Sequence, residues 1–560
     1  MPLPINRRHL LLGSTGLALT AAACGTPNRQ LPPAPTGPFR HGVASGEPDQ
    51  TSVVLWTAIS EDGGGELTWQ VAADADFTDI VWEETEQRQY IRMNPVSTYK
   101  AVATGLDPDR RYFYRALHNG EPSPVGRTRT LPAQPRDRFN IAFCSCSNYP
   151  AGYFNAYREM ANTPDLDLVL HLGDYIYEYG QGGYATEDAE DLDRVPTPLH
   201  ECLTYADYAA RHAQYKSDPD LQAAHAAAPW FITWDDHEVA NDTWSDGAEN
   251  HNDGEGEWVS RRSEALRAFH DWNPTREPED LIGGLKTVEI AGLATIALTE
   301  SRHTARTEQL TFDSFPIAYD AEDTPENRAL VAEWLRDVVG DPSREMLGME
   351  QIEAIASAFR ASREGGTPWQ VLGGQVLLGK LNMPNYVEAL PGWLKWIVRN
   401  REPLAWEYVL RSRFDSPFSF DSWDGYPAER ERLYAAVLDA TDGMIALAGD
   451  THNFWTCALA TEAGRPVGYE FGTTSISSPS EFEGIPAPGV HFGRITEAAN
   501  AEILHHEPYR RGFIRLSLTP EAVEADYVQV STVKRTGYDA SLDSRWRVTR
   551  GEGGLELEAL

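Results

Sequence analysis

The most informative stretch of this chain is Asp167-Leu168-Val169-Leu170-His171-Leu172-Gly173-Asp174-Tyr175-Ile176-Tyr177. Its first half is an almost uninterrupted apolar run, which is typical of a strand buried on both faces of a parallel sheet. Gly173 permits a tight turn where the run ends, so Asp174 would project beyond the sheet. Open α/β sheets bind their ligands at the carboxyl ends of the strands. The stretch therefore predicts an α/β fold with site-forming residues at a strand end.

Three other apolar runs end in the same way. One such cluster alone would also fit a helix cap or a turn. Four together indicate a shared site, because the side chains involved are those that ligate metal ions. The runs and the residues after them are 139–143 with Cys144-Ser145-Cys146, 230–234 with Asp235-Asp236-His237-Glu238, and 444–448 with Gly449-Asp450-Thr451-His452.

Strands alternate with helices from about residue 137 to 530, which predicts one α/β catalytic body. Residues 531–560 are expected to be a C-terminal tail. The predicted strands are 139–145, 165–172, 230–234, 287–299 as a hairpin, 369–378, 443–448, 513–518 and 523–530. The predicted helices are 153–162, 205–215, 258–272, 327–339, 349–363 and 428–440.

The region before this body has a different pattern. Short alternating strands separated by turns over residues 39–132 indicate a small all-β sandwich. The spacing from Leu106 to Tyr112 resembles the tyrosine corner of fibronectin-type domains. Residues 24–38 are rich in proline and are expected to form a semi-extended linker.

The first 23 residues have the pattern of an export signal. Arg7 and Arg8 precede an apolar run, residues 10–23, that is too short to span a bilayer as a helix and ends in small residues. Paired arginines followed by two leucines are typical of a twin-arginine signal, which would make the twin-arginine export machinery a partner. An ordinary secretory signal also fits. Cys24 is a candidate lipid anchor, although Ala21 stands where leucine is usual. We therefore expect an exported protein of the periplasm, cell surface or medium.

The net charge of the chain limits the classes of molecule that it is expected to bind. Its 48 Lys and Arg against 84 Asp and Glu give a formal net charge of −36. A chain this acidic is not expected to bind duplex nucleic acid, which requires a basic surface. An anionic substrate would need bound cations to attract it. Five cysteines are too few for a disulfide scaffold in an exported protein of this length.

Five stretches together carry a resemblance to a known family: 42–48 with 54–57, 171–179, 233–242, 421–427 and 449–453. With them the chain resembles the PhoD-like alkaline phosphatases of the calcineurin-like metallophosphoesterase superfamily. The resemblance implies a fibronectin-like domain followed by a four-layer α/β/β/α sandwich. It also implies hydrolysis of phosphate esters with one ferric ion, Fe(3+), and calcium ions, Ca(2+).

The resemblance further implies a set of ligands and catalytic groups. Asp174 would bridge the cations. His237 neighbours a proposed ligand without needing to be one, so it is our candidate to protonate the leaving oxygen or steady the transition state. Carboxylates at 236 and 450, where relatives carry Asn and His, suit calcium. The implied metal ligands are Cys146, Asp174, Tyr177, Asp236, Asp450 and His452, and the implied catalytic residues are His237, Asp236 and Asp174. A disulfide between Cys144 and Cys146 would be strained and is not expected.

Four residues are candidates for substrate binding: Asn241, Asn453, Arg302 and Gln375. Arg302 would contact phosphate or form a structural salt bridge, and both remain open. Gln375 would face the site or be a buried, satisfied amide. Arg302 lies in Glu300-Ser301-Arg302, where the family commonly has Asp-Thr-Arg. This departure puts any fine specificity inherited from the family in doubt.

The predicted function is hydrolysis of a small phosphate ester by a metal-activated water molecule. Bound metal ions would polarise the phosphoryl oxygens, so no protein nucleophile is required. Two alternatives remain open. The chain would otherwise be a phosphodiesterase of the phospholipase D type, or a non-catalytic binding protein of the cell surface.

Overall fold

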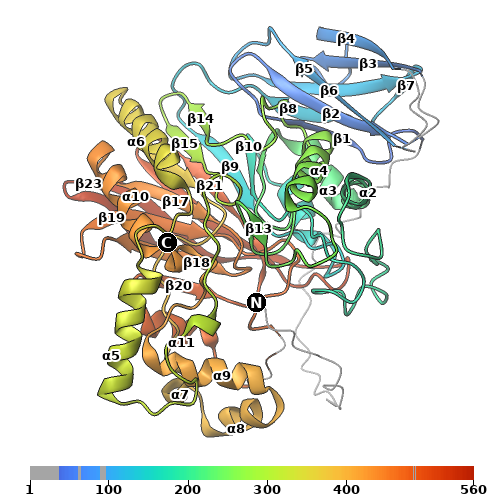
Figure 1. Ribbon diagram of the computed structural model, residues 1–560. Helices are drawn as coiled ribbons and strands as arrows, with labels where there is room; N and C mark the ends of the chain where they lie inside the picture. Colours follow the sequence, from blue (N-terminus) through green and yellow to red (C-terminus); the bar gives the residue numbers. More distant parts are fainter. Residues whose placement is uncertain (1–36, 61–64, 89–95, 484, 486) are drawn as a thin grey trace, which may run out of the picture.

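The computed structural model describes residues 37–60, 65–88, 96–483, 485 and 487–560 (Figure 1). The predicted export signal, Cys24 and nearly all of the predicted linker lie outside the described residues. Within the described part of the chain, no helix is both long enough and apolar enough to cross a membrane.

Two large sheets form the body of the molecule. The ten-stranded sheet has the order β24-β23-β22-β21-β9-β10-β11-β1-β2-β5, and the seven-stranded sheet has the order β14-β15-β16-β17-β19-β18-β20. The strands of the first sheet are β1 (Val43–Gly46), β2 (Val53–Ile59), β5 (Ser97–Ala103), β9 (Phe139–Cys144), β10 (Leu168–Leu172), β11 (Trp230–Thr233), β21 (Arg511–Leu518), β22 (Ala522–Val530), β23 (Ala540–Gly551) and β24 (Gly554–Ala559). Those of the second are β14 (Lys286–Ile290), β15 (Ala294–Leu298), β16 (Trp369–Gly373), β17 (Met444–Ala448), β18 (Phe454–Ala460), β19 (Pro466–Gly472) and β20 (Ile503–Glu507).

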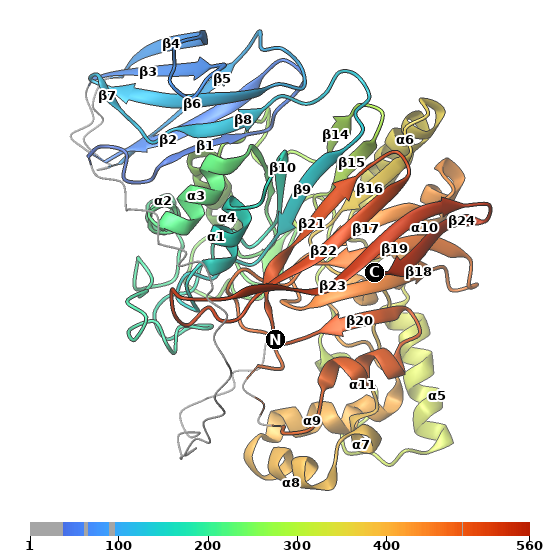
Figure 2. The same ribbon diagram turned by 180° about the vertical axis from the view of Figure 1, so that it is seen from behind.

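The two sheets face each other across an apolar core, to which β9, β10, β15, β16 and β17 all contribute. Helices cover the outer face of each sheet (Figure 2). On the first sheet they are α1 (Asn155–Ala161), α2 (Tyr205–Lys216), α3 (Pro219–Ala227) and α4 (Trp258–Trp272), and on the second α6 (Gly348–Glu364) and α10 (Pro427–Ala440). The predicted four-layer α/β/β/α sandwich is therefore confirmed. Strands β9, β10 and β11 are parallel to one another, as are β15, β16 and β17, so each group ends at one edge.

The N-terminal region is all-β, as predicted. A smaller sheet packs over β1, β2 and β5 around buried residues that include Leu55 and Trp69. It consists of β4 (Ile80–Arg88), β3 (Gly65–Ala72), β6 (Arg111–His118) and β7 (Glu121–Pro122), with β8 (Gly126–Arg129) on β6. The backbone N–H of Asp107 donates to Tyr112 Oη at 2.8 Å, which is the bond expected of a tyrosine corner. Strand β1 also pairs with β11, so one sheet of the sandwich continues into the body.

A group of short helices, not predicted from the sequence, lies at one end of the molecule (Figure 1). Helices α7, α8, α9 and α11 share a small apolar core with the loop around Phe482. Their bounds are α7 (Tyr386–Ala389), α8 (Gly392–Arg401), α9 (Pro403–Arg411) and α11 (Phe492–Ala499). Helix α5 (Pro325–Trp334) lies beside them and continues into a π-helical turn, Leu335–Val339. A two-stranded ribbon, β12 (Thr243–Trp244) with β13 (Gly247–Ala248), follows β11 in the chain.

The prediction of a tail over residues 531–560 is wrong. Strands β23 and β24 in this segment extend the first sheet, with Val548 opposite Val523 on β22. Val548 is fully buried in the core between the sheets. The segment looked polar because Arg545 and Arg547 face solvent and pair with Asp526 and Glu524 across the strands. Because these cross-strand ion pairs place many charged residues in the segment, its composition alone does not indicate a strand.

Replacing Val548 by aspartate tests this correction. We expect Val548→Asp to destabilise the protein by several kcal/mol, because an unpaired carboxylate would be buried between the sheets. Leu542→Asp on the same strand is the matched control, since Leu542 is 45% exposed. Equal thermal unfolding midpoints for the two variants would contradict the placement of β23.

Candidate metal centre

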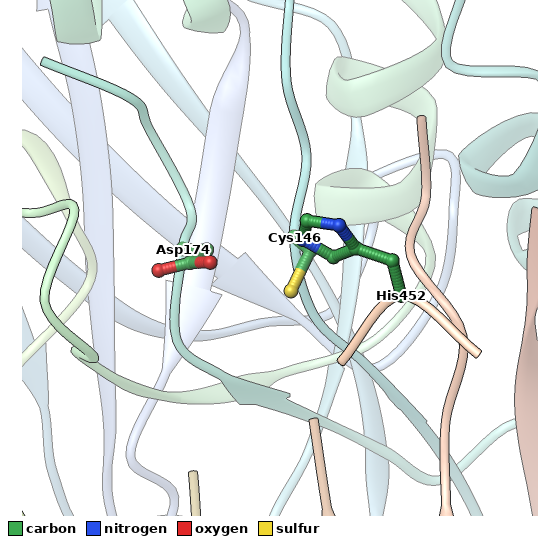
Figure 3. A group of neighbouring side chains, drawn as sticks. All are labelled: Cys146, Asp174 and His452. Carbon is green, nitrogen blue, oxygen red and sulfur yellow. The ribbon is translucent and has the colours of Figure 1, made fainter. Parts of the chain in front are cut away.

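Side chains that follow four separate strands meet in one cleft. Three groups of possible ligands have all their ligand atoms within 4.8 Å of one another. They are Cys146 with Asp174 and His452, Asp174 with Asp236 and His237, and Asp174 with Asp235 and Asp450. Figure 3 shows the first group, in which residues after β9, β10 and β17 face one another. Asp174 belongs to all three groups and therefore lies at their centre.

The backbone at these positions is unusual. Cys146, Asp174, Asp450 and His452 all have φ between 56° and 63°, in the left-handed region. Non-glycine residues rarely adopt this conformation, and such strain gathers at functional sites. Each turn immediately after a strand directs its side chain into the cleft instead of continuing the sheet.

Gly173 is required at the same place. Its φ is +106°, and a Cβ atom built on it would lie 2.4 Å from Asp235 Cβ. The turn after β10 can approach the turn after β11 only because residue 173 has no side chain. This contact brings Asp174 and Asp235 together.

Tyr177 joins the first group through its phenol. Tyr177 Oη donates to Asp174 Oδ2 at 3.0 Å and lies 3.1 Å from His452 Nε2. His452 Nδ1 lies 2.9 Å from the carbonyl oxygen of Pro479, which can only accept, so Nδ1 carries the proton. Burial lowers the pKa of His452 to about 3, which leaves a neutral imidazole with its Nε2 lone pair facing the cleft.

Glu178 positions His237. His237 Nδ1 donates to Glu178 Oε2 at 2.8 Å, and Glu178 Oε1 accepts from the Asn241 backbone N–H at 2.9 Å and from Asn250 Nδ2 at 2.8 Å. Burial alone would lower the pKa of His237, but the carboxylates of Asp236 and Glu178 hold it well above its usual value. The contact with Glu178 therefore fixes the orientation of the His237 ring through Nδ1.

Glu238 ties the neighbouring turns together. Its carboxylate accepts the backbone N–H groups of Asp174 at 3.1 Å and Asp235 at 2.8 Å, and also that of Tyr175. Glu238 is completely buried. It fixes the backbone on which the central carboxylate stands, and it does so without facing the cleft itself.

Arg302 is held by carboxylates in the protein interior. Its guanidinium donates to Asp421 at 2.7 and 2.9 Å and also to Asp235, while Asp236 lies 3.7 Å away. The Arg302 side chain is completely buried. Of the two readings open from the sequence, these contacts favour the structural salt bridge over phosphate binding.

The other predicted substrate residues are placed as follows. Gln375 lies beyond the end of β16, buried, and accepts from Ser301 Oγ at 2.7 Å while donating to the Thr299 carbonyl at 2.8 Å. Of the two possibilities that the sequence left open, Gln375 is therefore the buried amide whose hydrogen bonds are satisfied. Asn241 Nδ2 donates to Glu249 at 3.3 Å. Asn453 Oδ1 is buried and has no hydrogen-bond partner among the described residues. Of the four predicted substrate residues, Asn453 is the one with a buried side-chain atom that lacks a partner in the described chain.

The donor set fits metal ions. Asp174 Oδ1 and Asp235 Oδ2 are buried and have no hydrogen-bond partner within the described ranges. Burial, with further contributions from Asp235 and Asp236, raises the pKa of Asp174 well above its usual value, and burial does the same at Asp450. Buried carboxylates this close together need cations between them to stay ionised. Asp450 and His452 are half-buried, so the cleft opens to solvent on the side of β17.

Sequence reasoning missed several residues that support this cleft. Asp235 and Glu238 were counted in the cluster after residues 230–234 without an individual role, and Glu178 and Asp421 were named only within the stretches that carried the resemblance. The position of Asp235 next to Asp236 does not by itself predict that both side chains reach the site, because successive residues usually point in different directions. The roles of these four residues depend on the direction in which the backbone turns each carboxylate, and the sequence does not show that direction. Cys144 and Cys146 are both free thiols, as expected.

The structure is that of a four-layer α/β/β/α protein. Its candidate metal centre is a buried cluster of carboxylate, imidazole and thiol groups at the strand ends. Residues 141–527 match the family model described as PhoD-like phosphatase, and residues 25–132 match that of the PhoD-like phosphatase N-terminal domain. The chain belongs to the PhoD-like phosphatase family, and it is a hydrolase that acts on phosphate esters.

Two relatives extend this result over more than nine tenths of the chain. Alkaline phosphatase D of Bacillus subtilis (strain 168) is 32% identical over 540 residues, which cover 92% of this chain and 82% of the relative. A solved structure described as that of PhoD has 30% sequence identity and a TM-score of 0.74, with coverage of 94% of this chain and 93% of that one. Membership of this family makes the chain an enzyme and not the non-catalytic binding protein that the sequence left open.

Substituting Arg302 separates its two possible roles. We expect Arg302→Gln to destabilise the protein by about 3–5 kcal/mol, because Asp235 would lose its buried cationic partner and Asp421 would keep only Arg306. Arg328→Gln is the control, since Arg328 forms only exposed ion pairs with Asp323 and Asp415 and should cost about 1 kcal/mol or less. A raised KM with an unchanged unfolding midpoint for Arg302→Gln would instead assign Arg302 to the substrate.

Proposed function

We propose that phosphate-ester hydrolysis takes place at a metal centre held by Cys146, Asp174, Tyr177, Asp235, Asp236, Asp450 and His452. The observation that carries the proposal is the position of Asp174, which all three ligand groups share and whose Oδ1 has no other partner in the described part of the chain. A carboxylate has two oxygens and is suited to bridge two cations. When bound, metal ions supply positive charge to the phosphoryl oxygens and lower the pKa of a water molecule.

The ligands favour two kinds of cation. The Cys146 thiolate, the Tyr177 phenolate and the His452 imidazole make a group suited to a transition metal, and phenolate oxygen favours ferric iron. The group of Asp174, Asp235 and Asp450 offers only carboxylate oxygen, which calcium prefers. We therefore propose one ferric ion beside one or more calcium ions. Burial raises the pKa of both the Cys146 thiol and the Tyr177 phenol, so both would ionise only against a bound cation.

The protein's own groups supply the remaining chemistry. His237, fixed through Nδ1 by Glu178, presents Nε2 to the cleft and gives a proton to the leaving oxygen of the ester. Asp236, which accepts the Asp242 backbone N–H at 2.6 Å, is held in a fixed orientation beside it. Asn453, with its free Oδ1, is the remaining candidate for contact with the substrate or its water.

We also propose that the enzyme is exported. The support is the pattern of residues 1–23, with Arg7 and Arg8 ahead of a short apolar run, which is typical of a twin-arginine signal. Export in the folded state would allow iron and thiolate to assemble before the chain leaves a reducing compartment. Lipid anchoring at Cys24 remains a candidate feature of the mature protein.

The Asp174→Asn variant tests the bridging role. We expect at least about a 100-fold loss of kcat, together with a lower content of bound metal by elemental analysis and an unchanged circular dichroism spectrum. Asp188→Asn is the matched control, because Asp188 is a half-exposed carboxylate later in the chain whose one ion pair among the described residues is with Lys534. Full turnover by Asp174→Asn would exclude Asp174 as the bridge.

Side-by-side assays with a nitrophenyl monoester and a bis-nitrophenyl diester distinguish a phosphomonoesterase from a phosphodiesterase. We expect turnover of the monoester by the metal-loaded enzyme, and its loss after chelation. Turnover of the diester alone would establish the phospholipase-D-like phosphodiesterase alternative. No turnover of either ester, even with iron and calcium restored, would contradict the proposed centre.

A further inference from the structure

Helix α8 exposes two tryptophans on one side. Trp393 is 43% and Trp396 is 65% exposed, and residues three apart on a helix are neighbours on its surface. They are the only tryptophans among the exposed large apolar residues of the described chain. Leu404, at the start of α9, is 46% exposed as well. Large apolar side chains gathered on a surface mark a site of interaction.

The other side of α8 holds the helix in place. Leu394 is 1% exposed and packs in an apolar core with Val409, Phe482 and Phe492. The two tryptophans take no part in that core. Both views show α8 at the outer edge of the helical group, away from the two large sheets (Figures 1 and 2). The helix is thus anchored along one face and has an unpartnered apolar face.

The charge on α8 is opposite to that of the protein as a whole. Its ten residues contain Lys395, Arg399 and Arg401 and no acidic residue, which gives +3. The whole chain carries 48 − 84 = −36. Lys395 Nζ donates to the Val387 carbonyl at 2.6 Å, whereas Arg399 and Arg401 are exposed. A short helix with Trp on its apolar side and Arg beside it is the pattern of a helix that lies in the interface of an anionic bilayer.

We propose that α8 docks the enzyme onto an anionic lipid surface. Trp393 and Trp396 would enter the headgroup region, where tryptophan is favoured, and Arg399 and Arg401 would contact lipid phosphates. A second copy of this chain fits less well, because two α8 helices would bring +3 against +3. This inference goes beyond the proposed function and does not depend on the metal centre.

Docking through α8 would also orient the catalytic cleft. Ser478 Oγ donates to Tyr177 Oη at 2.8 Å, and the Pro479 carbonyl accepts from His452. Three residues later, Phe482 packs in the core beneath α8. The segment that supports the candidate metal ligands therefore continues directly into the lipid-facing helical group, and the two are held in a fixed relation.

Co-sedimentation with vesicles tests the proposal. We expect the full chain to bind vesicles of phosphatidylglycerol and to bind phosphatidylcholine vesicles much more weakly, with binding to the former reduced by added salt. Trp393→Ser with Trp396→Ser, and separately Arg399→Gln with Arg401→Gln, should each lower the partition coefficient about fivefold or more. Hydrolysis of a soluble nitrophenyl ester should stay unchanged in both variants.

Matched controls are Val259→Ser with Leu542→Ser, which remove comparably exposed apolar side chains on α4 and β23, and Arg360→Gln, which removes an exposed charge on α6. These should bind vesicles as the parent chain does. All variants keep residues 1–36, so any binding by the leader is common to them. Equal vesicle binding by the α8 variants and the parent would overturn the proposal. A second result would also overturn it: the parent chain does not bind vesicles but forms a concentration-dependent dimer in sedimentation, and the tryptophan variant does not form that dimer.

Discussion

The arrangement of the cleft depends on one buried carboxylate. Asp174 is 1% exposed, stands among Asp235, Asp236 and Asp450, and is common to every ligand group. Arg302 pairs with Asp235 and shares Asp421 with Arg306, and His237 is already paired with Glu178. These contacts leave Asp174 Oδ1 without a hydrogen-bond partner in the described chain. Because buried charge is stable only when it is paired, these carboxylates need bound cations to stay ionised.

The sequence predicted the centre of the site better than its surroundings. Cys146, Asp174, Asp236, Asp450 and His452 each follow an apolar strand closely, so strand topology alone brings them to one edge. Glu178 and Glu238 could not be assigned in this way, because their roles depend on turns in which backbone and carboxylate directions are set by tertiary contacts. The same holds for Arg302, whose buried partners come from two other segments of the chain.

The fold was predictable where strands are buried on both faces and not where they are exposed on one. Strands β10, β11 and β17 are continuous apolar runs, and the helices α4 and α10 have clear boundaries in the sequence. Strand β23 is rich in charged and polar residues, has Val548 as its one buried residue, and was mistaken for a tail. Helices α7 to α9 are too short for a periodic pattern, although one of them carries the most exposed tryptophan. Surface elements of this kind follow from packing around the core and not from their own composition.

The most direct test of the account is the thermal unfolding midpoint of the purified enzyme before and after removal of metal by chelation. If Asp174 and its neighbours depend on bound cations, the metal-free protein unfolds at a clearly lower temperature, and restoring iron and calcium recovers the original midpoint. An unfolding midpoint that is the same with and without metal would show that the buried carboxylates need no cation, which would contradict the central claim.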